Sequence, residues 1–349
     1  RILSINHPSK MTTVPPIRWG ILSTAKIARK HVLPAFKKCE GATCVIVGIA
    51  SRDLTKAESV VEAFKVGVPY GSYESLLQDP NIDAVYIPLP NDQHKEWAIQ
   101  AMRHGKHVLC EKPLALSVGD IDALIAVRNE TKLLISEAFM TRNHPQWELV
   151  RDMINAKNER GSSSFGELVS LQCVFSYALA DPSNIRLQPQ HGGGALMDIG
   201  VYPIAMARYL LRSEPKRVMT TSVSWNNVDE SWSAMLAFEK VTLHFTVSMN
   251  MPRHQRFYLY GTKQLLEMEI PFNAVADQAM RIKVQEEGKG ERYVNAPPVD
   301  QYQRQIEEFS RAVQSDSTLP FPLEDARANM RVVEALQESE KQGKVWIDL

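Results

Sequence analysis

Cysteine is scarce in this chain of 349 residues, and its four copies are widely spaced: Cys39, Cys44, Cys110 and Cys173. The sequence has no CxxC motif and no second pair near the first two, so it predicts four free thiols rather than a disulfide framework or a zinc site. The sequence also lacks an export signal. We therefore expect a cytoplasmic protein in a reducing compartment.

Net charge and long apolar segments are lacking as well. Forty Lys and Arg balance forty Asp and Glu, so the formal net charge is zero and gives no reason to expect nucleic acid or an anionic membrane as a partner. No apolar run reaches the roughly 18 residues of a membrane helix. His104 and His107 have no carboxylate or thiolate near them in sequence, and we expect no metal site.

What is present is a regular alternation over the first 140 residues. Apolar runs rich in Val and Ile alternate with helical patterns, which predicts a parallel sheet covered by helices on both faces. The predicted strands are 17–22, 43–50, 83–88, 106–110 and 132–136, and the helices are 25–37, 53–65, 92–104 and 117–130. Asp92 is placed to cap the third of these helices and Gly105 to end it.

After about residue 142 the strands become long and alternate in polarity. In 241–249 one face carries Val241, Leu243, Phe245, Val247 and Met249, and the other carries Thr242, His244, Thr246 and Ser248. This period of two indicates a half-buried strand in a mostly antiparallel sheet. The polar face is either wetted or covers a partner subunit. Further strands are predicted at 167–177, 217–226, 232–238, 256–260, 264–270 and 279–285, and helices at 301–314 and 323–342.

Glycine is missing where a dinucleotide-binding fold would use it. In "GILSTAKIA" a strand enters a loop in which Ser23, Ala25 and Ala28 occupy the three positions of a G-x-G-x-x-G fingerprint. All three are small, which is what lets a pyrophosphate approach the backbone at a helix N-terminus. We expect Ser23, Thr24, Ala25 and Ile27 to form the phosphate loop. The alternative is an ordinary strand–turn–helix.

The end of the second strand predicts which dinucleotide is bound. In "VGIASRD", Ser51 and Arg52 stand where an NAD enzyme carries an acid for the ribose 2′-hydroxyl, and an arginine there suits a 2′-phosphate. Asp53 could serve as that acid, but it is better placed to cap the next helix. The sequence therefore favours NADP(H) over NAD(H).

Two later strand ends supply further candidates at the carboxyl edge of the sheet. After the strand at 83–88, Leu89, Pro90, Asn91 and His94 form a rim where the two polar side chains face a ligand or cap the following helix. The strand at 106–110 delivers "EKP". Its Glu111 and Lys112 are either a solvated strand end or a charged pair that polarises a carbonyl.

The second domain contains "HGGGALMDIGVYPI", whose three glycines would let the backbone pass close to a flat ligand. Asp198 and Tyr202 are four apart and share one face of a helix, although Pro203 disfavours helical geometry at the tyrosine. Tyr202 is either a core aromatic or a general acid. In the second case we expect a nearby lysine to lower its pKa.

Taken in order, "GILSTAKIA", "ASRD", "PLPNDQH", "EKP" and "GGGALMDIGVYPI" resemble the Gfo/Idh/MocA family of NAD(P)-dependent oxidoreductases from Ile17 onward. The resemblance implies that Lys112 lies near the nicotinamide and substrate hydroxyl, and that a large sheet forms the subunit interface. Tyr202 stands where inositol dehydrogenases carry histidine. It resembles the branch with glucose–fructose oxidoreductase, dihydrodiol dehydrogenase, D-xylose dehydrogenases and ketosugar reductases, in which an arginine like Arg186 lies near cofactor and substrate.

The predicted fold is α/β: a Rossmann doubly wound parallel sheet, followed by an α+β domain with a large, mostly antiparallel open sheet. Residues 1–15 are expected to be an extension, 16–141 the NADP-binding domain, and 142–349 the substrate and oligomerisation domain of a homodimer or homotetramer. The predicted activity is hydride transfer between nicotinamide and a sugar, ketosugar or related polyol. The catalytic residues would be Tyr202, Lys112 and Asp198, with Arg186 also near the substrate. The alternatives are a non-catalytic nucleotide-responsive regulator and an NAD-dependent glycosidase.

Overall fold

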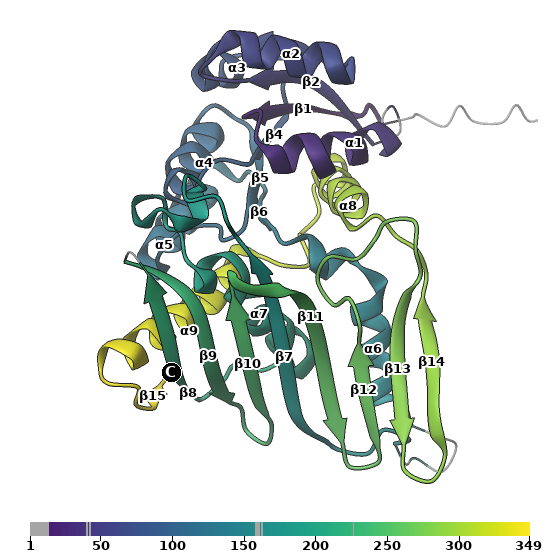
Figure 1. The fold of residues 1–349 in the computed structure, drawn as a ribbon. Coiled ribbons are helices and arrows are strands. Elements are labelled where there is room, and N and C mark those ends of the chain that lie inside the picture. Colours follow the sequence, from purple (N-terminus) through teal and green to yellow (C-terminus); the bar gives the residue numbers. More distant parts are fainter. Residues whose placement is uncertain (1–13, 40, 42, 158–160, 162, 226) are drawn as a thin grey trace, which may run out of the picture.

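Two β-sheets organise the chain in the computed structural model, one above the other in Figure 1. The structure describes residues 14–39, 41, 43–157, 161, 163–225 and 227–349, so most of the predicted N-terminal extension lies outside the described residues. Within the described ranges, no helix is long and apolar enough to cross a membrane.

The first sheet has six parallel strands in the order β3-β2-β1-β4-β5-β6, the doubly wound arrangement predicted from the sequence. Its chain order reverses between β1 and β4, so ligands are expected at the carboxyl ends of these strands. The strands are β1 (Ile17–Leu22), β2 (Cys44–Ala50), β3 (Val68–Tyr70), β4 (Ala84–Ile87), β5 (His107–Glu111) and β6 (Ile135–Ala138). The short β3 was not predicted; only three residues long, it includes Pro69 and lies at the sheet edge, where a missing N–H is tolerated.

Helices cover both faces of this sheet: α1 (Leu33–Cys39), α2 (Leu54–Phe64), α3 (Tyr73–Leu77), α4 (His94–Arg103) and α5 (Val118–Thr131). Asp53 caps α2 as predicted, accepting a hydrogen bond from the Thr55 N–H. The predicted cap of α4 by Asp92 is wrong. A 3₁₀ turn at Asn91–Gln93 precedes that helix, and the Asp92 carboxylate instead lies 3.0 Å from Nδ1 of His191.

The second sheet has nine strands in the order β14-β13-β12-β11-β7-β10-β9-β8-β15. Its neighbours are antiparallel except for β7 and β10, which confirms a mostly antiparallel sheet. The strands are β7 (Leu168–Ala178), β8 (Arg217–Trp225), β9 (Val228–Ala237), β10 (Thr242–Ser248), β11 (Asn250–Gly261), β12 (Gln264–Met268), β13 (Met280–Glu286), β14 (Gly290–Ala296) and β15 (Ile347–Asp348).

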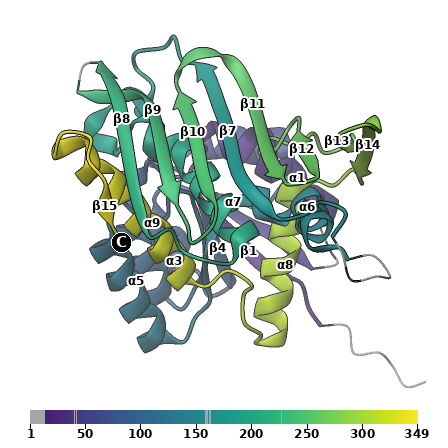
Figure 2. The ribbon, with the colours of Figure 1, turned by 90° about the horizontal axis from the view of Figure 1, so that it is seen from below.

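Only one face of this second sheet is covered by described helices, as Figure 2 shows. On that side lie α6 (Pro145–Asn155), which was not predicted, α7 (Val201–Leu211) and α9 (Leu323–Lys341). Leu243, Phe245 and Val247 of β10 are buried against them. On the opposite face Thr242, His244 and Thr246 are half-buried, whereas Ser248, predicted on the polar face, is buried at the end of the strand.

Helix α8 (Gln301–Ser315) follows strands of the second sheet in the chain but packs against the first sheet. Ile306 and Phe309 of this helix are buried with the core on the α1 side of the parallel sheet. The indole N–H of Trp19 in β1 donates to Ser310 Oγ at 3.1 Å, and its ring centroid lies 5.4 Å from that of Phe309. The two sheets are therefore joined by packing as well as by the chain.

Candidate active site

The loop after β1 has the backbone conformation of a glycine turn without the glycine. Ser23 has φ of +143°, a region that residues other than glycine rarely adopt. Its hydroxyl accepts a hydrogen bond from the Ala25 N–H at 3.1 Å, which helps to hold the turn. The π-helical turn Ala28–Val32 and then α1 follow directly. The turn thus holds a residue other than glycine in a strained backbone conformation.

The two charged residues after β2, Arg52 and Asp53, differ in their contacts. Arg52 is exposed and, among the described residues, lies within 4 Å of no carboxylate. The Asp53 carboxylate accepts from both the N–H and the hydroxyl of Thr55, at 3.1 and 2.6 Å. Buried Tyr73 lies beside Arg52 and Ser23: burial raises the pKa of its hydroxyl, and the charge of Arg52 works against that rise. Sequence reasoning missed Tyr73.

The rim after β4 is held by His94 from inside the protein. This side chain is fully buried, and its two ring nitrogens lie 2.8 Å from the carbonyl oxygens of Leu89 and Pro113. It therefore braces two loops and is not itself placed to touch a ligand. Asn91 extends across to the second domain and donates to the Gly192 carbonyl at 3.0 Å.

Asp198 is the centre of the polar cluster between the two domains. The Lys112 ammonium, delivered by the end of β5, lies 3.1 Å from its Oδ1 and also donates to its backbone carbonyl at 2.8 Å. The Arg186 Nε donates to the same Oδ1 at 2.9 Å, and the Tyr177 hydroxyl from β7 donates to Oδ2. One carboxylate thus gathers a lysine, an arginine and a tyrosine.

These contacts determine the charge of the cluster. Burial would raise the pKa of Asp198, but the charges of Lys112 and Arg186 outweigh it and hold that pKa well below its usual range. Burial and the charge of Asp198 raise the pKa of Tyr177. At neutral pH the carboxylate is ionised and the Tyr177 hydroxyl keeps its proton.

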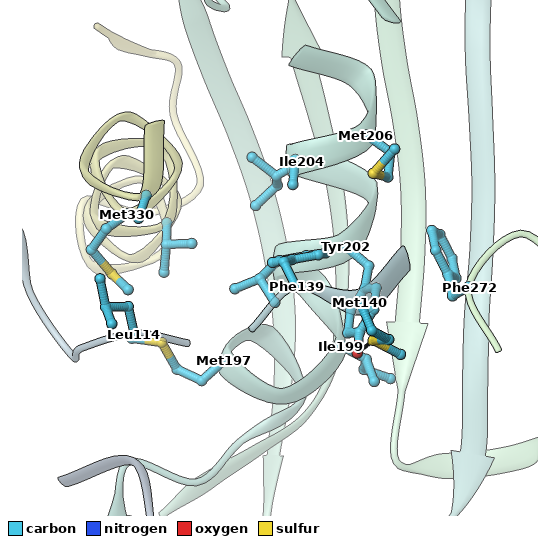
Figure 3. Packing of buried hydrophobic residues seen from close by; sticks show 14 of the residues in the cluster. Leu114, Phe139, Met140, Met197, Ile199, Tyr202, Ile204, Met206, Phe272 and Met330 are labelled. Atoms are coloured by element: carbon cyan, nitrogen blue, oxygen red, sulfur yellow. Dashed lines mark hydrogen bonds between the residues drawn. The ribbon is translucent and has the colours of Figure 1, made fainter. Parts of the chain in front are cut away.

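Tyr202 lies in a buried aromatic pocket directly below Lys112. Its ring is 4 % exposed and packs against Phe139, with centroids 4.8 Å apart, and Phe272, at 5.2 Å (Figure 3). The hydroxyl donates to Sδ of Met140 at 3.5 Å, and the Lys112 ammonium lies 5.2 Å from the ring centroid. Tyr202 is thus a packed aromatic that also borders the polar cluster.

The pKa of Tyr202 moves in the direction opposite to the prediction. Burial raises it well above the usual value, and the negative charges of Glu111 and Asp198 add to the rise. The prediction that a nearby lysine lowers this pKa is therefore wrong for the protein alone, because burial and two carboxylates dominate. Tyr202 stays protonated at neutral pH.

Three further acidic or phenolic groups come from the neighbouring strands β4, β5 and β6: Tyr86, Glu111 and Glu137. Of these, only Glu111 was predicted. The buried Glu111 carboxylate accepts from the Tyr86 hydroxyl at 2.6 Å, and burial raises its pKa. Glu137 of β6 accepts from the Leu114 N–H at 3.0 Å, and its second oxygen has no partner within the described structure. Burial raises the pKa of Glu137 too.

The glycines before the helix are required by packing within the protein. A Cβ at Gly193 would lie 2.4 Å from the Arg186 carbonyl oxygen, and one at Gly194 would lie 2.1 Å from the Asp229 carboxylate. That carboxylate accepts from the Leu196 N–H at 2.8 Å. The glycines let Asp229 hold the start of the helical segment that carries Asp198.

The helical segment itself is continuous through the predicted proline break. A π-helical turn at Leu196–Gly200 leads directly into α7, which contains Pro203. Pro203 therefore lies inside a continuous helical segment, directly after its π-helical turn, a local irregularity that often accompanies a proline or a bend in a helix. Tyr177 could have been found from its place at the carboxyl end of the predicted strand 167–177.

Within the described ranges, no group of three His, Cys, Asp or Glu side chains could hold a metal ion.

Comparison with known proteins identifies the family behind this geometry. The model of the oxidoreductase family with an NAD-binding Rossmann fold (GFO_IDH_MocA) matches residues 17–139, and the GFO/IDH/MocA C-terminal domain model matches 153–267. The chain belongs to the GFO/IDH/MocA oxidoreductase family. The predicted resemblance is confirmed.

Other members of this family match nearly the whole chain. An uncharacterised oxidoreductase of Rhizobium meliloti is 40% identical over 94% of this chain and 98% of its own. The NADP(+) D-xylose 1-dehydrogenase 2 of Haloferax volcanii is 35% identical over 93% and 98%. A 3-ketoreductase from Actinomadura kijaniata, solved with NADP and TDP-benzene, superposes with a TM-score of 0.86 at 32% identity, over 93% and 98%. The chain is a member of a family of sugar-related NAD(P)-binding oxidoreductases.

The strained Ser23 gives a first test. The free energy of unfolding should be about 1–3 kcal/mol larger for Ser23→Gly than for Ser23→Ala, because only glycine adopts this φ without strain. Both variants lose the hydroxyl that holds the Ala25 N–H, so their difference isolates the backbone. Urea unfolding measures it, and a calorimetric titration with NADPH shows whether the relaxed loop binds differently. Equal stability of the two variants would contradict the strain.

Proposed function

We propose that this protein is an NADP(H)-dependent oxidoreductase acting on a sugar, a ketosugar or a related polyol or dihydrodiol. The single observation that carries the proposal is the cluster of Lys112, Asp198 and Tyr202 at the carboxyl end of β5. NADP, when bound, supplies or accepts the hydride. NADP also accompanies the ketoreductase structure and appears in the name of the xylose dehydrogenase.

The residues of the first domain fit a dinucleotide with a 2′-phosphate. The positive φ of Ser23 is one that glycine usually supplies, as it does in the phosphate loops of dinucleotide-binding folds. Arg52 is exposed for an anion, and the Asp53 carboxylate is already engaged by Thr55, so it is not free for a ribose 2′-hydroxyl. Ser23, Thr24, Ala25, Ile27, Ser51 and Arg52 would hold the phosphates. Leu89, Pro90 and Asn91 would border the cofactor, with His94 acting through the loops it braces.

Within the cluster, Lys112 would orient the substrate oxygen. Two of the three N–H bonds of its ammonium are directed to Asp198. The third remains for the substrate oxygen. Asp198 fixes the position of the ammonium and, with Arg186, shapes the substrate side of the pocket.

Tyr202 would exchange the proton. Its raised pKa keeps the hydroxyl protonated, which is the form needed to give a proton to a carbonyl oxygen as that oxygen becomes a hydroxyl. In the reverse direction the same hydroxyl must first lose its proton, so oxidation should be favoured by rising pH.

Replacing two tyrosines tests the assignment. Tyr202→Phe should lower kcat by about 10²–10⁴-fold, the range for losing a positioned acid, while NADPH still binds. Tyr177→Phe is the matched variant, because it removes one tyrosine hydroxyl of the same region, the one that donates to Asp198, and it should cost much less. Rates are measured with NADPH and a panel of aldoses, ketosugars and dihydrodiols. A larger loss in Tyr177→Phe than in Tyr202→Phe would make Tyr177 the proton donor instead.

Cofactor choice can be tested separately. Arg52→Ala should weaken NADPH binding by about 10–100-fold, the worth of a charge-assisted hydrogen bond, and change NADH binding little. Arg103→Ala, which removes another exposed arginine of the same domain, is the control. The affinities come from fluorescence titration. An equal effect on the two cofactors would show that Arg52 does not contact the 2′-phosphate.

We also propose that a second copy of the chain packs on the bare face of the nine-stranded sheet. This face is hollowed by a cavity of about 520 Å³, lined among others by Val174, Met219, Met235 and Tyr258. Threonine, serine and methionine side chains on a broad sheet suit a flat, self-complementary contact. The unit would be a homodimer or homotetramer, and the cytoplasmic location remains a prediction.

Charge placed in this face should separate the copies. Met235 pairs with His244 on the neighbouring strand, so Met235→Glu puts a carboxylate in the middle of the proposed contact. Light scattering should show a shift to the monomer mass. Leu54→Glu, at an exposed apolar residue of α2, should keep the mass of the unmodified protein. If the unmodified protein is itself a monomer, the proposed contact does not exist.

A further inference from the structure

A second cavity, of about 390 Å³, lies between α6, α7 and the start of α9 and has no part in the proposed reaction. None of its lining residues belongs to the predicted cofactor or substrate pocket. Arginine dominates the lining. We call it the arginine pocket, after Arg142, Arg151, Arg208 and Arg212, which line it together with Tyr209 and Phe321.

The pocket carries more positive than negative charge. Its only lining carboxylates are Glu214 and Asp325, which against four guanidinium groups leaves an excess of two positive charges. Asp325 lies 2.5 Å from Arg142 and 3.0 Å from Arg208, and Glu214 lies 2.6 Å from Arg208. Both acids are therefore committed to the same two arginines.

Arg151 and Arg212 differ from the other two arginines of the pocket. Among the described residues, neither lies within 4 Å of a carboxylate oxygen. Arg151 lies over the ring of Tyr209. Burial raises the pKa of the Tyr209 hydroxyl, while the charges of Arg151 and Arg212 lower it. Glu148 and Asp152 of α6 also act on Tyr209, but they do not line the cavity. Within the described lining of the cavity, Arg151 and Arg212 thus have no carboxylate as an ion-pair partner.

Aromatic rings lie against two of these arginines. The Arg142 guanidinium lies between the rings of Phe139 and Phe321, at 4.8 and 4.6 Å from their centroids, and Arg151 lies 4.8 Å over Tyr209. A guanidinium stacked on a ring keeps its in-plane N–H bonds for an acceptor, and pairs of such bonds match phosphate oxygens. The buried Nε of Arg142 has no acceptor within the described structure.

The start of α9 adds to the same field. This helix of 19 residues begins after Pro322, which lines the pocket and offers no side-chain cap. The N-terminal N–H groups of a helix favour an anion, although Asp325 in the first turn offsets part of this effect. The stacked arginines remain the main contribution.

We propose that the arginine pocket binds a phosphate dianion, either free or as the terminal phosphate of a small metabolite. Its two uncommitted positive charges match the charge of the dianion. The volume leaves room beyond one phosphate group, and the rings of Tyr209 and Phe321, 6.0 Å apart, offer an apolar wall for the rest of a larger ligand.

Calorimetric titration of the full chain at low ionic strength tests the proposal, with inorganic phosphate and glucose 6-phosphate as the two probes. We expect saturable binding at one site per chain, with Kd at or below about 1 mM. The variant with Arg151→Ala and Arg212→Ala together should bind at least about 30-fold more weakly, since removing one charge-assisted hydrogen bond weakens binding by roughly tenfold or more. Tighter binding of the sugar phosphate assigns the pocket to a phosphorylated metabolite, and equal affinities assign it to free phosphate.

Two controls separate this site from others. Arg331→Ala removes an exposed arginine of α9 outside the pocket and should leave binding unchanged. Arg52→Ala removes the proposed cofactor phosphate contact, and binding in the arginine pocket should survive it. The proposal is overturned if neither probe saturates, or if the double variant binds as tightly as the unmodified protein while folding normally by circular dichroism.

Discussion

The buried carboxylate of Asp198 is the group on which the rest of the site depends. A buried charge is costly unless it is paired and hydrogen-bonded. Here the pairing comes from Lys112 at the end of a parallel strand, Arg186 in a loop and Tyr177 in the large sheet. Each donor belongs to a different part of the chain. Satisfying one carboxylate therefore fixes where the two domains meet and where the lysine is held.

Tyr202 combines two descriptions that a sequence presents as alternatives. Its ring belongs to the core with Phe139, Phe175 and Phe272, and its edge borders the polar cluster. Close packing makes the position of the hydroxyl definite, because an aromatic ring enclosed on several sides has little rotational freedom. The same enclosure raises the pKa. Packing and proton chemistry are therefore linked at this residue.

Most of the fold could be predicted from the sequence, because it is encoded locally. Continuous apolar runs, alternating polarity and cap residues such as Asp53 each indicate a helix or strand from residues that are close together in the sequence. Two of the elements missed, β3 and β14, are short or lie at a sheet edge, whereas α6 is an eleven-residue helix that was missed although Trp147 and Val150 are buried in it. The small side chains of the predicted phosphate loop are visible in the sequence, whereas the strain at Ser23 shows only in the backbone.

The site was less predictable, because partners distant in the chain decide each role. His94 looked like a ligand-facing residue, yet two carbonyl groups enclose it. The glycines at 193 and 194 were expected to leave room for a ligand, and the structure shows that they leave room for Arg186 and Asp229. Asp92 stood where a helix cap is expected, but its carboxylate lies against His191, 99 residues away in the chain. In each case the observed contact depends on a partner that the local sequence does not name.

Helix α8 bears on how this architecture can be divided. The family models end their first match at residue 139, as if the nucleotide-binding unit were complete there. Yet Trp19 in its central strand is covered by Phe309 and hydrogen-bonded to Ser310, nearly three hundred residues later. A fragment ended at the family boundary would expose a tryptophan and the neighbouring apolar surface of α1. Exchange of cofactor domains between members of this family would therefore have to carry α8 along with the parallel sheet.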